Sequence, residues 1–424
     1  MNSTPHTPLR RSGILLALII AGEAVFLLPF VLPRIFRPTL LAVFELSNTE
    51  LGGAFSAYGW LAVVSYLLGG PLADRYPARR LMAAALAATG LGGIILTTVP
   101  TRSVLTILYA CWGMTTILLF WAALIRATRE WGGAQAQGRA YGLLDGGRGL
   151  FAALLASGAV WLLGLLLPQD VSSTNPAERE AALRIVIWVF TGFTLGAAGL
   201  VWWLIPDQEP VHVTGLPPRL TLAGVWAVAQ MPVVWLQAGI VVCAYVGYKS
   251  VDTLSLYARE VFGYDEVSAA GVSTIAFWVR PAAALVAGWL GDRFSASRVI
   301  VAGFGLMGAG CVAIANGWVQ PGLPWTLTLA VITGCIGIFA IRGVYFALFE
   351  EAQVPLALTG SAAGLVSMIG FTPDVFMGPM TGFILDGHPG AAGHLQLNLV
   401  LAGFTVAGLV CAGAYTWLVT RRPA

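Results

Sequence analysis

The sequence has few charged residues and only one lysine. Of its 424 residues, 10% are charged and 58% are hydrophobic, and every basic residue except Lys249 is an arginine. A soluble protein of this length must expose far more polar residues to water, so the composition excludes an ordinary soluble domain. Apolar runs near twenty residues are typical of membrane-spanning helices, whereas transmembrane barrels have short alternating segments. We therefore expect an all-α polytopic membrane protein.

Other scarce features exclude further classes. The net charge of +3 is too small to indicate a nucleic-acid partner. The five cysteines fall in apolar segments at unrelated spacings, which indicates neither a disulfide framework nor a metal site. A P-loop needs a lysine after its glycines, and the sequence has no such motif. The four histidines fall in predicted tails or loops: His6, His212, His388 and His394. We expect no enzymatic activity, no cofactor and no metal.

Apolar runs bounded by glycine, proline and charge predict twelve membrane-spanning helices. Segment 206–230 is polar and then amphipathic, which predicts a cytoplasmic linker with an interfacial helix. The linker would separate an N-terminal six-helix bundle at 1–205 from a C-terminal six-helix bundle at 231–424. The predicted helices are 12–34, 51–71, 81–99, 104–127, 140–167, 185–205, 232–258, 267–289, 298–316, 325–349, 359–385 and 396–419.

The arginines predict the orientation in the membrane. Loops on one side of the predicted helices carry most of them, and such loops lie on the cytoplasmic side. Both termini fall on that side, as an even number of spans requires. We therefore expect a multi-pass protein of the cytoplasmic membrane. The arginines assigned to the cytoplasmic side are Arg10, Arg11, Arg75, Arg79, Arg80, Arg129, Arg139, Arg219, Arg293, Arg298, Arg421 and Arg422.

A motif recurs after the second and the eighth predicted helices. Residues 70–80 read Gly-Pro-Leu-Ala-Asp-Arg-Tyr-Pro-Ala-Arg-Arg, and residues 288–298 read Gly-Trp-Leu-Gly-Asp-Arg-Phe-Ser-Ala-Ser-Arg. The two copies are about half the chain apart. Such a repeat predicts two parallel six-helix halves related by an axis along the membrane normal.

This motif resembles the loop between helices 2 and 3 of the major facilitator superfamily, G-x-L-a-D-R-x-G-R-R/K. The resemblance covers the whole chain in length, number of spans and recurrence of the loop. The chain departs from the pattern at the second glycine, which is Pro77 or Ser295, and at the next basic position, which is Ala78 or Ala296. The resemblance implies a transporter that works by alternating access.

The charged residues of the two loops are candidates for gating. Asp74 and Asp292 end helices on the cytoplasmic side, where each can meet a helix N-terminus or an arginine in one conformation only. Arg126, near the end of the fourth helix, is a candidate partner together with Arg129. The alternative is that these charges only fix the topology. The gating candidates within the loops are Asp74, Arg75, Asp292 and Arg293.

Lys249 lies in the seventh predicted helix, roughly 25 Å from its start and in the outer half of the membrane. An ammonium in hydrocarbon needs a polar cavity, a counter-ion or a substrate. Tyrosine hydroxyls on the same face favour a polar cavity that binds a substrate. The alternatives are that Lys249 extends outward or pairs structurally with Asp252. The residues that share this face, at i, i+3, i+4 and i+7, are Tyr245, Tyr248, Lys249 and Asp252.

The seventh helix also resembles that of the organophosphate:phosphate antiporters. In that branch a basic residue beside a tyrosine binds the anionic substrate and a Y-x-[KR]-E-V run follows, which is 257–261 here. This chain has Gly247 at the position of the family's arginine and carries its base two residues later. The resemblance implies a substrate-binding role for Lys249. Arg34, at the end of the first helix, is a weaker match to the second substrate arginine and alternatively belongs to a loop.

Arg280 lies roughly 18 Å into the eighth helix, near mid-membrane. With Pro281 it resembles the helix 8 arginine of the monocarboxylate and oxalate:formate transporters. A guanidinium binds a carboxylate through two parallel hydrogen bonds, so we expect Arg280 to bind substrate. The alternative is a structural ion pair with a residue of another helix.

Further charges lie within predicted helices. Glu23, roughly 15 Å into the first helix, is a candidate proton carrier together with Asp252, or alternatively a counter-ion for Arg280 or Lys249. Asp145 and Arg148 lie among closely spaced glycines, which favours a structural ion pair. Arg342 is a candidate for binding substrate through its positive charge, or alternatively for lining or gating. Asp374 follows a proline that can form a hinge and is a candidate for lining or gating.

The charges together favour a secondary transporter of a small organic anion such as a carboxylate, phosphate ester or sulfonate. It would be proton-coupled or anion-exchanging, and monomeric in the bilayer. An exporter of cationic or amphipathic compounds should have acidic residues in excess within its central helices, whereas bases are at least equal here. A neutral solute such as a sugar remains open if the charges neutralise each other, as does a receptor that binds without transporting.

Overall fold

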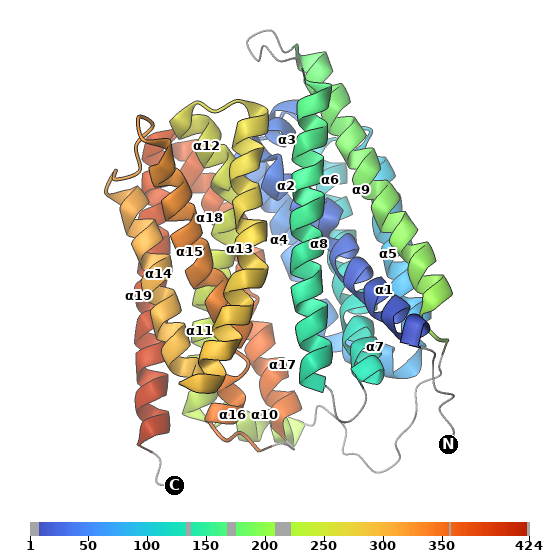
Figure 1. The fold of residues 1–424 in the computed structure, drawn as a ribbon, viewed down its shortest axis with the longest axis vertical. Helices are drawn as coiled ribbons and strands as arrows, with labels where there is room; N and C mark the ends of the chain where they lie inside the picture. The colour runs from blue at the N-terminus through green and yellow to red at the C-terminus, as the bar shows by residue number, and fades with distance from the viewer. Residues whose placement is uncertain (1–7, 133–136, 168–174, 208–221, 356–357, 422–424) are drawn as a thin grey trace. The chain divides into compact units, whose positions relative to one another are not determined.

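The computed structural model describes residues 8–132, 137–167, 175–207, 222–355 and 358–421 (Figure 1). Twelve helical segments of these residues are long and apolar enough to cross a membrane, which confirms the predicted number of spans. Residues 208–221, most of the predicted linker, lie outside the described ranges. The second part of the predicted linker contains a short helix, α10 (Leu222–Ala229). Its location at the membrane interface stays a prediction.

The described residues of the first six spans, with the short helix α3 between the first and second spans, form eleven helical elements. They are α1 (Pro8–Phe26), η1 (Leu27–Val31), α2 (Leu32–Ile35), α3 (Arg37–Val43), α4 (Asn48–Arg75), α5 (Ala78–Leu96), α6 (Arg102–Gly113), η2 (Met114–Trp121), α7 (Ala122–Gly132), α8 (Gln137–Leu166) and α9 (Pro176–Leu204).

The described residues of the last six spans, with the short helix α16 between the tenth and eleventh spans, form ten helical elements. They are α11 (Pro232–Ser250), η4 (Val251–Thr253), α12 (Leu254–Phe262), α13 (Glu266–Arg293), α14 (Ala296–Ala315), α15 (Pro324–Val344), α16 (Leu348–Glu351), α17 (Thr359–Gly370), α18 (Pro373–Gly387) and α19 (Ala391–Thr420).

Four spans are interrupted. η1 and η2 are π-helical turns in the first and fourth spans, and η4 is a 3₁₀ turn in the seventh. Pro29 gives η1 a local cause, because proline lacks the N–H that continues the α-helical ladder. The eleventh span divides into α17 and α18 just before Pro373. The hinge expected at this proline stays a prediction. Such interruptions release backbone polar groups and are common at functional sites.

The chain divides into two compact units. Unit 1 is Met1–Leu46 with Ala57–His212, and unit 2 is Ser47–Ser56 with Val213–Ala424. The predicted bundle boundaries placed the start of the second span with the N-terminal bundle. The structure instead groups 47–56 with unit 2, because the Asp386 carboxylate accepts hydrogen bonds from the main-chain N–H groups of Asn48 (3.0 Å) and Thr49 (2.7 Å).

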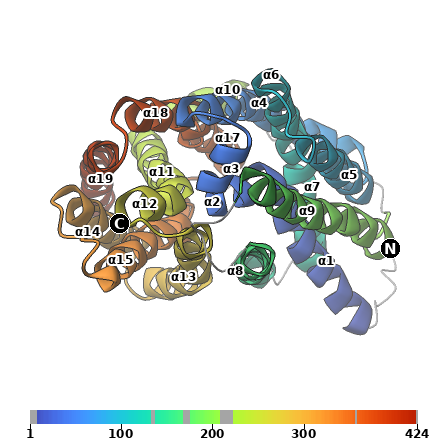
Figure 2. The same cartoon turned by 90° about the horizontal axis from the view of Figure 1, so that it is seen from above.

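Close helix packing in unit 2 depends on small residues. α14 lies beside both α15 and α19, which Figure 2 shows from above. A Cβ atom on Gly337 of α15 would lie 2.3 Å from the carbonyl oxygen of Gly303 on α14, so only glycine allows this approach. Small residues at such interfaces let helices pack closely where lipid provides no hydrophobic driving force.

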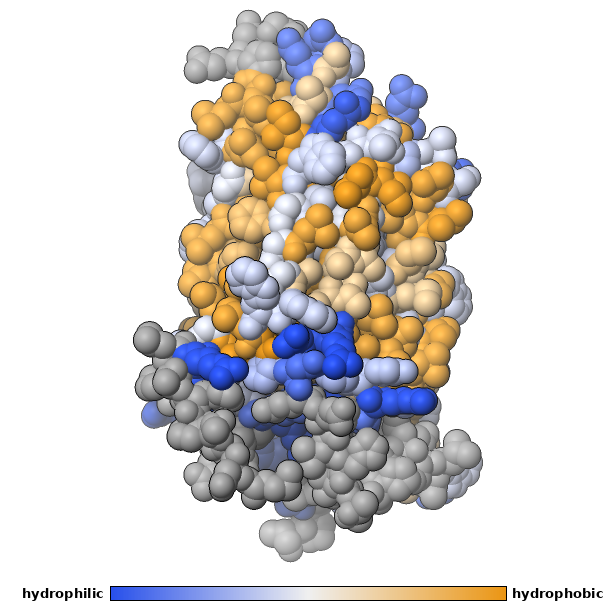
Figure 3. All heavy atoms as spheres, turned by 90° about the vertical axis from the view of Figure 1, so that its right-hand side faces the viewer, coloured by the Kyte–Doolittle hydropathy of each residue, from blue (hydrophilic) through white to orange (hydrophobic). Residues whose placement is uncertain are grey.

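The surface is that of a protein surrounded by lipid. One face shows apolar residues over its middle and hydrophilic residues gathered below them (Figure 3). Large apolar side chains point outward in both units, among them Trp161 and Trp203 in unit 1 and Trp289 and Phe383 in unit 2. In water such exposure is costly, whereas hydrocarbon solvates these side chains well.

Candidate functional site

Charged and aromatic side chains from three spans meet inside unit 2. α11 and η4 supply Lys249 and Asp252, α18 supplies Asp374, and α15 supplies Arg342. We call these four residues with Tyr245 and Tyr248 of α11 the unit 2 cluster. All four charged side chains lie within membrane-spanning helices, where an ionised group is retained only with partners or for function.

Lys249 lies between two carboxylates. Its Nζ atom is 3.2 Å from Oδ2 of Asp252 and 3.4 Å from Oδ1 of Asp374, and the side chain is buried. The 3₁₀ turn η4 continues the chain beyond α11 so that Asp252 returns to the lysine three residues before it. The structure therefore shows the pairing with Asp252 that the sequence left as an alternative. The positive charge of Lys249 is compensated within the cluster.

Asp374 joins the cluster through the first turn of α18. Pro373 begins that helix, and the Asp374 carboxylate lies in its first turn, where the helix dipole favours a negative charge. The Tyr245 hydroxyl donates a hydrogen bond to Oδ2 of Asp374 at 3.0 Å. The sequence placed Asp374 only among gating candidates. The structure places it against two of the predicted substrate-binding residues, Lys249 and Tyr245.

Arg342 lies over the two tyrosine rings. Its Cζ atom is 3.9 Å from the ring centroid of Tyr248 and 5.3 Å from that of Tyr245. A guanidinium stacks well on an aromatic face, and its five N–H donors lie in its own plane, where they stay available to acceptors. The Nη1 atom of Arg342 is buried and has no hydrogen-bond partner among the described residues. A buried donor of this kind normally has an acceptor, so it marks a place where an anion can bind.

Aromatic rings enclose the tyrosine pair. Phe371 lies edge-on to Tyr245, with ring centroids 5.0 Å apart, and Phe339 lies edge-on to Tyr248 at 6.2 Å. Phe55, from the part of α4 that belongs to unit 2, contributes a ring 5.1 Å from Nζ of Lys249. The surroundings of the charges are therefore mostly apolar, which strengthens electrostatic interactions within the cluster.

Two further arginines that the sequence predicted to bind substrate lie on helices that supply no residue of the unit 2 cluster. Arg280 is half-buried midway along α13, one residue before Pro281, as predicted. Arg34 is in the short helix α2 of unit 1 and is only 4% exposed, so the alternative that it belongs to a loop is wrong. Arg37, at the start of α3, is buried as well. Sequence reasoning did not select Arg37, although it also follows the apolar run of the first span.

A second buried ion pair lies in unit 1. Nη2 of Arg148, on α8, is 3.3 Å from Oε2 of Glu23 on α1, and its Nε donates to the Gly22 carbonyl oxygen at 3.0 Å. The predicted Asp145–Arg148 pair is longer, at 3.8 Å, and the Asp145 side chain is 58% exposed. Glu23 thus has a counter-ion that the sequence did not suggest. Trp121 of η2 lies against the same guanidinium, 5.5 Å from Cζ to the ring centroid.

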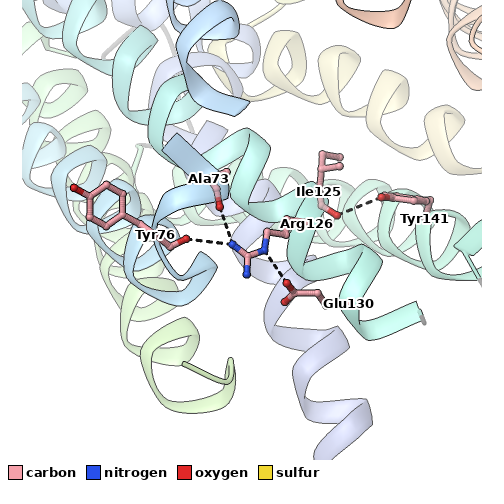
Figure 4. Close-up of polar contacts among 6 residues, drawn as sticks. All are labelled: Ala73, Tyr76, Ile125, Arg126, Glu130 and Tyr141. Atoms are coloured by element: carbon pink, nitrogen blue, oxygen red, sulfur yellow. Dashed lines mark hydrogen bonds and ion pairs between the residues drawn. The ribbon is translucent and has the colours of Figure 1, made fainter. Parts of the chain in front are cut away.

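The first copy of the repeated loop is held by main-chain contacts. Arg126 donates to the carbonyl oxygens of Ala73 (2.7 Å) and Tyr76 (3.3 Å), and its Nε donates to Glu130 (2.7 Å), as Figure 4 shows. The predicted partner of Arg126 was an aspartate. The observed contacts lie on either side of Asp74 and satisfy carbonyls that the end of α4 leaves without helical partners.

The second copy has a comparable contact of opposite charge. Glu351 of α16 accepts a hydrogen bond from the main-chain N–H of Ser297, at 2.9 Å, and another from the Ser297 hydroxyl. A carboxylate there is favoured because it meets the positive end of α14. Asp74, Arg75, Asp292 and Arg293 are exposed. Arg75 and Arg293 lie near rings of neighbouring residues, Tyr76 and Trp289.

His394 differs from its prediction as a loop residue. It is buried in the first turn of α19, where its Nε2 lies 2.9 Å from Oε2 of Glu260 and its ring is edge-on to Tyr257. No group of three or more His, Cys, Asp or Glu side chains that could hold a metal occurs within the described ranges. His388, by contrast, directly follows the last residue of α18.

The sequence matches a family and resembles known proteins. The model of the Major Facilitator Superfamily matches residues 13–379. Inner membrane protein YqcE of Escherichia coli is 25% identical over 98% of this chain and 96% of its own length. The probable nitrate/nitrite transporter NarK2 of Mycobacterium tuberculosis is 28% identical over 51% of this chain and 50% of its own length.

The fold also matches a solved structure. A bacterial homologue of the human lysosomal transporter Spinster, in an inward-facing and unoccupied conformation, superimposes with a TM-score of 0.73. The match covers 99% of this chain and 98% of that chain at 17% sequence identity. At this identity the likeness establishes the fold alone.

Proposed function

The chain belongs to the Major Facilitator Superfamily, and we propose that it carries a small organic anion across the cytoplasmic membrane by alternating access. Membership makes it a multi-pass membrane transporter and not an enzyme. The relative YqcE is named as an inner membrane protein, in agreement with the proposed location. The substrate class is argued from the unit 2 cluster.

The observation that carries the proposal is the environment of Arg342. Its guanidinium is held against Tyr248, and its Nη1 is a buried donor without an acceptor in the described part of the chain. Leaving a charged donor buried and unsatisfied costs free energy. A carboxylate, phosphate ester or sulfonate oxygen would satisfy it, and guanidinium geometry suits such planar or forked acceptors.

The other predicted substrate-binding residues have different roles in this proposal. Tyr245 and Tyr248 position Arg342 through their rings. Arg280, half-buried midway along α13, stays a predicted substrate-binding residue. Lys249 is compensated by Asp252 and Asp374, so it acts on the substrate through them rather than as an open charge. NarK2, named as a probable transporter of the anions nitrate and nitrite, supports an anionic substrate.

A ligand-stabilisation screen on purified protein tests the proposal. The probes are glucuronate, lactate, glycerol 3-phosphate, methanesulfonate, glucose and tetraphenylphosphonium, which cover acidic, neutral and cationic solutes. We expect at least one anion to raise the melting temperature. Arg342→Ala should weaken its binding about 10- to 100-fold, since a charge-assisted hydrogen bond contributes about 1.5–3 kcal/mol.

Arg298→Ala is the matched control, because Arg298 is an exposed arginine in the first turn of α14. It should leave the anion-induced shift unchanged. The proposal fails if only glucose or the cation stabilises the wild-type protein, or if Arg342→Ala binds the anion as tightly as the control does.

A neutral solute is the second candidate function. The charges pair within each unit, Lys249 with Asp252 and Asp374, and Arg148 with Glu23. Paired charges present hydrogen-bond donors and acceptors to a hydroxyl-rich solute without a large net field. Stabilisation by glucose that is lost in Asp374→Asn and kept in Arg342→Ala would favour this function over anion transport.

A further inference from the structure

We propose that Asp374 takes up one proton together with the anion, so that the chain is an anion:proton symporter. The inference rests on the proposed anion function and concerns the same cluster. It also changes the residue assigned to proton coupling, because the sequence favoured Glu23 and Asp252 for that role.

The surroundings of Asp374 come from several elements. Lys249 and Tyr245 approach it from α11, and Asp252 approaches the same ammonium from η4. Arg342 of α15 lies beside the Tyr245 ring. The hydroxyl of the same tyrosine donates a hydrogen bond to the Asp374 carboxylate. The Phe55 ring of α4 lies on the ammonium. Asp374 is 6% exposed, so these groups and not bulk water set its charge.

Charge balance links the proton to the anion. Lys249 is one positive charge between two carboxylates, and Arg342, which lies against the rings of the tyrosine pair, supplies the second positive charge. An anion that binds Arg342 uses that second charge and adds a third negative charge to the cluster. Like charges at short range disfavour the ionised carboxylate, so the bound anion favours protonation of Asp374.

The coupling is reciprocal. If the anion promotes protonation, then protonation promotes anion binding by the same factor. With such positive coupling, the anion and the proton bind to the same conformation and cross the membrane together, which is symport. Exchange of the anion for a proton would instead require the two to exclude each other.

Two contacts favour Asp374 over the other carboxylates. Glu23 pairs with the guanidinium of Arg148 in unit 1 and is not one of the residues of the unit 2 cluster. Asp252 also pairs with Lys249. Asp374 pairs with Lys249 as well and accepts a hydrogen bond from the hydroxyl of Tyr245, whose ring lies beside the Arg342 guanidinium. Tyr245 can therefore transfer its hydrogen bond from the protonated Asp374 to the arriving anion.

The experiment measures anion affinity and proton uptake in the purified full-length protein. The probe is whichever of glucuronate, lactate, glycerol 3-phosphate and methanesulfonate gives the largest shift in the screen. Calorimetric titration in two buffers of different ionisation heat counts the protons bound. We expect about one proton per anion, with affinity falling about tenfold per pH unit on the alkaline side of the transition.

Asp374→Asn should bind the same probe with no proton uptake and with no dependence on pH. Glu23→Gln should keep both the proton uptake and the dependence on pH. Tyr245→Phe is a second test in case the asparagine variant does not fold. It removes the hydrogen bond from the Tyr245 hydroxyl but keeps the Asp374 carboxyl group, so about one proton per anion should still be taken up.

The outcomes separate the two proposals. If no anionic probe binds, the proposed function itself fails. If an anion binds wild-type protein without proton uptake, or if Asp374→Asn retains the pH dependence, anion binding stands and the role of Asp374 is refuted. If Glu23→Gln loses the pH dependence instead, Glu23 of unit 1 and not Asp374 is the residue that takes up the proton.

Discussion

Glu23 and Arg148 illustrate, at the scale of single residues, how a buried charge depends on its partner. The carboxylate is 3% exposed and the arginine 8%, and they are 3.3 Å apart. Removing water from two charges is costly, and the pair is tolerated because each compensates the other. Removal of one partner leaves an uncompensated charge, whereas removal of both leaves an apolar site.

We therefore predict that Arg148→Met lowers the free energy of unfolding by about 3–5 kcal/mol, and that adding Glu23→Leu restores most of it. Unfolding in mixed micelles, followed by circular dichroism, measures both. Asp145→Asn is the control and should cost less than about 1 kcal/mol, because Asp145 is largely exposed and farther from the arginine. An equal loss in Asp145→Asn would make Asp145 the main partner.

The sequence predicted part of the unit 2 cluster. Tyr245, Tyr248, Lys249 and Asp252 follow one another at helical spacing, so their proximity was visible in the sequence. Arg342 and Asp374 lie in other spans, and nothing in a single sequence states which faces of two helices meet. The signal for Asp374 was an aspartate directly after a proline, which is typical of a helix start. That signal locates a helix end but identifies no partner.

At the scale of helices, the contact between α14 and α15 depends on Gly337. A side chain at that position would overlap the Gly303 carbonyl, so the helices would have to separate. Gly334, one turn earlier on α15, has open space where its Cβ would lie. The two glycines therefore form a matched pair on one helix.

We predict that Gly337→Ala destabilises the protein by about 1–3 kcal/mol, the usual cost of overpacking. Gly334→Ala should be neutral or stabilising by up to about 1 kcal/mol, because alanine favours the helix. Melting temperatures in detergent compare the two. Equal destabilisation by both substitutions would mean that helix packing at Gly337 is not the cause.

Hydropathy predicted the helices well and their interruptions poorly. The spans follow from apolar length, which the bilayer sets. Pro29 indicates the π-turn η1 and Pro373 the break before α18, but Pro71, Pro281 and Pro379 lie inside continuous helices. No proline precedes η4, which places Asp252. Such turns depend on packing and hydrogen bonds from neighbouring helices, which local sequence does not specify.

At the scale of the whole molecule, the arginine distribution predicts that both termini face the cytoplasm. A green fluorescent protein fused at the C-terminus should fluoresce, and alkaline phosphatase fused there should be inactive. Alkaline phosphatase fused after Val99, between the third and fourth spans, should be active because that loop lies on the opposite side. The reverse pattern at the two positions would contradict the predicted orientation.

The repeat and the number of spans predicted the family, but not how the chain divides. Residues 47–56 group with unit 2 because Asp386 binds the first N–H groups of α4 and because Gly52 approaches Gly378. These residues are more than 300 positions apart, and neither is unusual for its local sequence. A sequence boundary between two bundles follows chain order, whereas a structural unit follows contacts.

The burial of the sole lysine also has a practical consequence. Amine-reactive reagents can modify only Lys249 and the chain's α-amino group, so the wild-type protein already carries one side-chain amine that reports on access to the unit 2 cluster. Mass spectrometry of labelled peptides would follow the rate at which reagent reaches that amine from either side of a vesicle. The opening of the site could then be timed without introducing any foreign residue.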